Sequence, residues 1–92
     1  MDTISQIPIR IIKEQELVIG PLAWEEARKV SGLTIDQSHS SVSFSGDGKD
    51  AINRLVAQYE RIFGKASQAV CHEAVADLIA KMSPEEVPSS LR

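Results

Sequence analysis

Two stretches in the C-terminal half carry apolar residues at helical spacing, and they constrain the fold more than any other feature. The apolar residues of the first stretch recur every three or four positions: Ile52, Leu55, Val56, Tyr59, Ile62 and Phe63. The second stretch repeats this spacing: Cys71, Ala74, Val75, Leu78, Ile79 and Met82. Such spacing gathers the apolar side chains on one face of each helix. With Gly64 between the two stretches, we predict helices over 50–63 and 67–82 that form an antiparallel hairpin.

Upstream, the sequence predicts one more helix followed by a β-hairpin. Pro21 suits a first helical position and Gly32 suits a left-handed C-terminal cap, which indicates a helix over 21–31. Leu33–Asp36 and residues 41–45 then alternate apolar and polar side chains, as half-buried strands do. The polar segment 37–40 between them has the length of a hairpin connection.

Residues 9–19 are open to two interpretations. Their apolar residues flank the polar run 13–16, which is typical of two short strands around a turn. The alternative is one long helix, which we rank second because its tandem β-branched residues lose side-chain freedom in a helix. Pro8 also suits the start of a strand.

These elements together predict an α+β fold in the order β-β-α-β-β-α-α. About four short strands would form a small antiparallel sheet with the helices packed on one face. We expect a disordered N-terminal tail over 1–6, a single domain over 7–87 and a mobile C-terminal tail over 88–92.

Composition excludes several classes of protein. The chain has 92 residues, 42% of them hydrophobic, and a net charge of −3, which fits one small globular domain. No apolar run approaches the length of a membrane span, so we expect no membrane association. A single cysteine excludes an internal disulfide, and the N-terminal residues do not resemble a secretory signal, so we predict a cytoplasmic protein.

None of the candidate motifs for catalysis or cofactor binding has the residue types and the spacing that its chemistry requires. The Gly46–Lys49 turn lacks the glycine spacing and the hydroxyl residue of a phosphate-binding loop. Cys71 lies on the apolar helix face, and the adjacent His72 points about 100° away from it. His39 sits in the polar connection, where it is most simply a solvated residue. We therefore lean towards a protein that is not an enzyme and has no cofactor or metal.

Our leading hypothesis for function is a regulatory or scaffold module that associates with itself, as a homodimer, or docks another protein through its C-terminal helical pair. A four-stranded sheet covers only one or two helices, so apolar surface on the pair would be left for a partner. The candidate interface residues are Trp24, Leu55, Tyr59, Ile62, Phe63, Leu78, Ile79 and Met82.

Two alternatives come from other classes of protein. In the first, residues 50–82 form a helix-turn-helix that binds nucleic acid. Its contacts would be Lys49, Arg54, Arg61, Lys65, Gln68 and His72. The net negative charge and the acidic residues Glu73 and Asp77 on the second helix disfavour it. In the second alternative, scattered residues form an enzyme or ligand site that leaves no sequence motif.

Overall fold

The computed structural model of the chain describes residues 3–36, 38 and 41–91. Most of these residues are helical, and two strands form the sheet. In chain order the elements are α1 (Thr3–Ile19), α2 (Leu22–Arg28), β1 (Leu33–Asp36), β2 (Ser41–Phe44), α3 (Gly48–Phe63), α4 (Ala66–Ala74), α5 (Ala76–Ile79) and the 3₁₀ turns η2 (Pro84–Glu86) and η3 (Ser89–Leu91).

The predicted four-stranded β-β-α-β-β-α-α fold is wrong, because residues 9–19 belong to helix α1 and not to a hairpin. The same helix includes residues 3–6, which we expected to lie in a disordered tail. Its inward side chains recur at three- and four-residue spacing from the first turn onwards, and among them are Ile4, Ile7, Pro8, Ile11, Ile12 and Gln15. This spacing is visible only when the pattern is followed from Ile4, upstream of the point at which we expected order to begin.

The magnitudes explain why the helix forms despite its β-branched residues. Each isoleucine in a helix costs less than about 0.7 kcal/mol relative to alanine. Fully burying such a side chain contributes about 1.5–3 kcal/mol, and Ile7, Ile11 and Ile12 are all fully buried. Pro8 lacks the backbone N–H that this position would donate, at a cost of about 3 kcal/mol or more. Burial of the three isoleucines is of the same size as these penalties together, and α1 buries the Pro8 side chain as well, so packing offsets the unfavourable local preferences.

The next three elements confirm the sequence predictions in their type and approximate bounds. Pro21 precedes helix α2, and Gly32 after it has a φ of 92°. Strands β1 and β2 pair antiparallel, with Leu33 opposite Phe44 and Ile35 opposite Val42. These four side chains pack on the core, whereas the alternate residues of both strands are exposed. Gln37, His39 and Ser40 of the predicted connection lie outside the described residues.

Helix α3 begins at Gly48, two residues before the predicted start, and ends at Phe63 as predicted. The Asp47 side chain accepts a hydrogen bond from the backbone N–H of Lys49 at 3.1 Å and so caps the helix. Gly64 follows the last turn with a φ of 84°. Close packing favours glycine at position 48, because the Cβ of any other residue would lie 2.9 Å from Cε2 of Phe44.

The single helix predicted over 67–82 is interrupted at Val75, where φ is −122°. A side chain from α1, Arg10, contacts the chain on both sides of this interruption. The guanidinium of Arg10 donates to the Ala74 carbonyl at 3.3 Å and to both carboxylate oxygens of Asp77, at 3.1 and 3.2 Å. Arg10 thus satisfies a carbonyl at the break, which no pattern within 67–82 reveals.

The C-terminal segment is docked where we expected a mobile tail. Ser89–Leu91 form η3, which packs on α3, and the Leu91 side chain is fully buried. Asn53 on α3 accepts hydrogen bonds at its Oδ1 from the N–H of Ser90 at 3.0 Å and from the Ser90 hydroxyl at 2.6 Å. The docked segment therefore contributes to the core.

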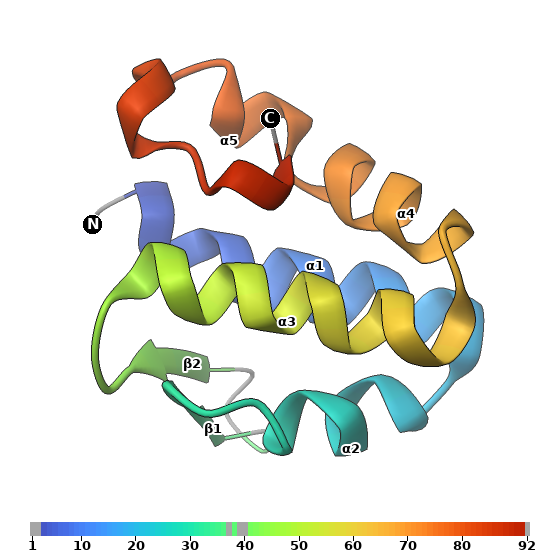
Figure 1. Cartoon of the computed structure of the whole chain (residues 1–92). Coiled ribbons are helices and arrows are strands. Elements are labelled where there is room, and N and C mark those ends of the chain that lie inside the picture. Colours follow the sequence, from blue (N-terminus) through green and yellow to red (C-terminus); the bar gives the residue numbers. More distant parts are fainter. Residues whose placement is uncertain (1–2, 37, 39–40, 92) are drawn as a thin grey trace.

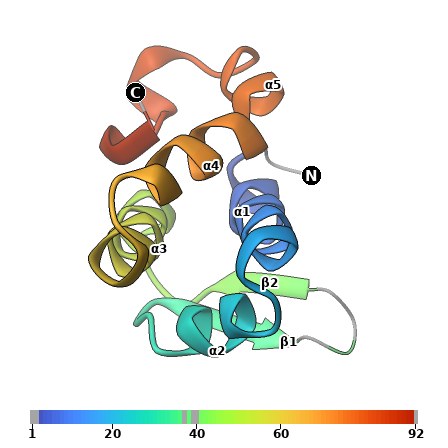
Figure 2. The same cartoon turned by 90° about the vertical axis from the view of Figure 1, so that its right-hand side faces the viewer.

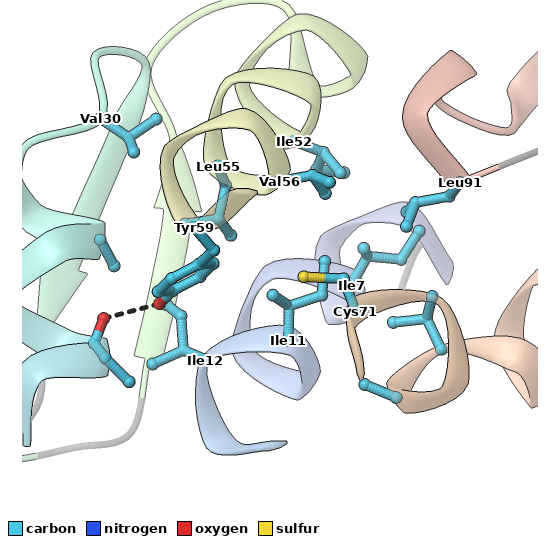
Figure 3. Close-up of a cluster of buried hydrophobic side chains, with 14 of the residues drawn as sticks. Ile7, Ile11, Ile12, Val30, Ile52, Leu55, Val56, Tyr59, Cys71 and Leu91 are labelled. Atoms are coloured by element: carbon cyan, nitrogen blue, oxygen red, sulfur yellow. Dashed lines mark hydrogen bonds between the residues drawn. The ribbon is translucent and has the colours of Figure 1, made fainter. Parts of the chain in front are cut away.

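The elements are arranged in three layers (Figures 1 and 2). Helices α1 and α3 lie side by side in the middle layer, and each of them contacts helices of both outer layers. Helix α2 and the two strands cover one side, and α4, α5 and the C-terminal segment cover the other. The main core cluster occupies the space between these layers, with Tyr59 on one side of α1 and Cys71 on the other (Figure 3).

Candidate functional site

The fold places four of the eight predicted interface residues in the interior. Leu55, Tyr59, Trp24 and Leu78 are at most 3% exposed. The Tyr59 hydroxyl donates a 2.6 Å hydrogen bond to the carbonyl of Ala23 on α2 (Figure 3). This burial raises the pKa of the Tyr59 phenol. These residues face inward because α1 packs against α2, α3, α4 and α5 and covers the surface that we expected to be left over.

The other four predicted interface residues are more accessible. Phe63, Ile79 and Met82 are partly buried and pack against the core cluster. Ile62 is 44% exposed and is the most accessible of the eight. The helical pair therefore presents little apolar surface of its own, and only Ile62 qualifies as a large exposed hydrophobic residue.

Exposed large hydrophobic residues lie near the ends of three helices: Leu17 (81% exposed) and Val18 (64%) at the end of α1, Leu22 (44%) at the start of α2 and Ile62 (44%) near the end of α3. We name these four residues the apolar end. The C-terminal ends of α1 and α3 and the start of α2 all lie on the right in Figure 1, and Figure 2 views the molecule from that side. Sequence reasoning missed Leu17 and Val18 because it placed them in a strand.

The six residues proposed for nucleic-acid contact divide into separate groups. Lys49, at the start of α3, donates to the Glu85 carbonyl at 2.8 Å. Lys65, Gln68 and His72 are exposed on or just before α4. Arg54 and Arg61 instead line a surface hollow between α3 and the segment after α2.

This surface hollow has a volume of about 280 Å³. We name it the basic hollow, and its lining residues are Lys29, Val30, Ser31, Arg54, Ala57, Gln58 and Arg61. Sequence reasoning singled out the two arginines for another purpose and missed Lys29. The signal available was their spacing, since residues seven apart on a helix share a face.

A hydrogen-bond network organises the side chains beside this hollow. The Glu26 carboxylate accepts from the Gln58 amide at 2.8 Å and from the Lys29 ammonium at 3.1 Å. These two contacts lower the pKa of Glu26, so it remains ionised at neutral pH. The Gln58 carbonyl oxygen then accepts from Arg61 at 2.9 Å. Arg54 pairs with Asp50 at 2.8 Å.

Cys71 lies in an environment that disfavours its reactive form. Its side chain is fully buried, and the Gln15 amide donates to its Sγ at 3.3 Å. Burial raises the pKa of the Cys71 thiol, which leaves little nucleophilic thiolate at neutral pH. His72, the next residue, is exposed, and His39 lies outside the described residues.

Two other kinds of site are absent from the part of the chain that the structure describes. No three histidine, cysteine, aspartate or glutamate side chains gather there in a group that would bind a metal ion. None of its helices combines the length and the apolarity that a membrane span requires. One buried side-chain polar atom in this part, Nε1 of Trp24, has no hydrogen-bond partner.

Comparison of the chain with protein families, with curated proteins and with solved structures finds no match.

Proposed function

We propose that this protein is a cytoplasmic interaction module that associates with itself through its apolar end. The observation that supports this is the exposure of Leu17 and Val18, at 81% and 64%, next to a well-filled core. Clusters of exposed apolar side chains on small domains mark contact surfaces, because water contact with each of them is unfavourable. Of the four residues of the apolar end, only Ile62 belongs to the helical pair that the sequence indicated.

A second copy of the chain is the occupant that we propose. In a two-fold symmetric dimer the same patch meets itself, so the apolar side chains of each copy cover those of the other. A standard interface buries about 800 Å² on each partner. The four side chains supply only the centre of such an interface, so we expect a weak and reversible dimer with a charged rim.

Sedimentation of the purified protein over a range of concentrations tests this proposal. We expect a monomer–dimer equilibrium that changes little with salt, because apolar burial is hardly screened. The Leu17→Lys variant should be monomeric at concentrations at which the wild type is dimeric. Ala76→Lys is the matched control, because Ala76 is also an exposed helical residue but lies on α5, away from the apolar end.

Two results would contradict self-association. One is a wild-type protein that stays monomeric at every concentration, and the other is a Leu17→Lys variant that dimerises as strongly as the Ala76→Lys control. The same samples, mixed with generic duplex DNA, test the nucleic-acid alternative. Binding that weakens steeply with salt would favour that alternative.

A further inference from the structure

Three cationic side chains converge on the basic hollow from two separate elements. Arg54 and Arg61 lie two turns apart on α3, about 10 Å along the helix axis, and Lys29 faces them from the segment after α2. Ala57 lies between the two arginines and is exposed. Because its side chain is a single methyl group, the space between the two guanidinium groups stays open.

Contacts with the protein hold these cations in place. Arg54 donates to Asp50 at 2.8 Å and to the Ser31 carbonyl at 3.3 Å, which ties its guanidinium to both sides of the hollow. Arg61 donates to the neutral Gln58 amide, and no ion pair joins it to a carboxylate among residues 3–36, 38 and 41–91. The charge of Arg61 is therefore available to a ligand.

The balance of charges and donors favours an anion. Two carboxylates, Glu26 and Asp50, offset part of the three positive charges, which leaves a net positive hollow. Each guanidinium has five N–H donors and the ammonium has three, and the contacts above use only a few of them. Several donors from different directions thus remain for the oxygens of one bound group.

We propose that the basic hollow binds a compact anion of the phosphate class, such as a diphosphate or the phosphate of a nucleotide. Guanidinium groups form paired hydrogen bonds with phosphate oxygens, and the ammonium adds a third point of contact. A tetrahedral phosphate directs its oxygens towards separate donors, as this hollow requires. The volume of about 280 Å³ is slightly below that of a typical pocket for a drug-sized ligand, which suits a small anion.

A titration of isotope-labelled protein with pyrophosphate, followed by NMR at constant ionic strength, tests this site. We expect saturable shifts of the amide signals of Val30, Ser31 and Ala57, with a Kd of about 1 mM or tighter. Arg61→Gln should weaken binding about tenfold, since it removes one charged hydrogen-bonding partner. Lys81→Gln removes the same charge from an exposed residue outside the hollow and should leave the affinity unchanged.

Two parallel titrations, one with a nucleoside diphosphate and one with a short duplex DNA, distinguish the sources of the phosphate. Tighter binding of the nucleotide at the same residues indicates a free phosphate ligand, and tighter binding of the duplex indicates a nucleic-acid backbone. Thermal melting confirms that Arg61→Gln remains folded. The proposal is overturned if pyrophosphate causes no saturable shift at the hollow, or if Lys81→Gln weakens binding as much as Arg61→Gln does.

Discussion

Removing the Leu91 side chain distinguishes a docked C-terminal segment from a mobile tail. The tail that the sequence suggests would make Leu91→Ala neutral. In the structure the Leu91 side chain is fully buried in the same core cluster as Ile7 and Ile52 (Figure 3). The substitution therefore removes buried apolar atoms and opens a cavity between α3 and the C-terminal segment.

The expected magnitude follows from this burial. Substitution of a buried leucine by alanine costs about 2–5 kcal/mol. Val87 and Pro88 of the same segment are also buried, so the leucine side chain is removed from a well-contacted part of the core. We therefore expect a loss of about 2–5 kcal/mol in the free energy of unfolding. For a domain of this size, each kcal/mol lowers the Tm by about 4–8 °C.

Urea denaturation followed by circular dichroism measures this effect. The midpoint should fall while the m value stays close to that of the wild type. Ser89→Ala is the control, because Ser89 belongs to the same turn but is exposed. Asn53→Ala, which removes the acceptor of two hydrogen bonds from Ser90, should destabilise the protein by about 1–2 kcal/mol. A Leu91→Ala protein with the same midpoint as the Ser89→Ala control would refute the docked segment.

Three further predictions concern buried or hydrogen-bonded groups. Tyr59→Phe should cost about 0.5–1.5 kcal/mol in urea denaturation, because it removes the buried hydrogen bond from the phenol to the Ala23 carbonyl; an unchanged midpoint would contradict this. Two hydrogen bonds from Ser83 lower the pKa of Glu86 from 4.5, so its stabilising contribution is present above that pH and is lost as the pH falls through the lowered pKa. As the pH falls through this range, the free energy of unfolding of Glu86→Gln should therefore decrease less than that of the wild type. An identical decrease in both proteins would count against this prediction. Cys71 should react with a thiol reagent at neutral pH only after unfolding in urea, and rapid labelling of the native protein would disprove its burial.

Elements whose signals are local were predicted well from the sequence. Gly64 ends α3, and the alternation in 33–36 and 41–44 gives the paired strands. Each of these signals depends on residues at most a few positions apart, so it does not require knowledge of the rest of the fold.

The errors occurred where a distant contact outweighs a local preference. In α1, burial against α3 and α4 offsets the strand propensity of the isoleucines and the cost of Pro8. At Val75 the helix breaks where Arg10, 64 residues away from Ala74, satisfies a carbonyl. The candidate sites follow from these differences, because α1 covers the predicted helical face and leaves Leu17 and Val18 exposed at its end.

The sequence alone determined that the chain contains an amphipathic helical pair and a short β-hairpin, and it determined which faces of these elements are apolar. Only the tertiary structure decided which apolar face each element meets. That choice depends on the summed burial of side chains from distant segments, about 1.5–3 kcal/mol for each large residue, whereas local propensities differ by less than about 1 kcal/mol. The basic hollow is also a feature that only the tertiary structure decided, since Lys29 and Arg61 line one hollow only after α2 has packed on α3.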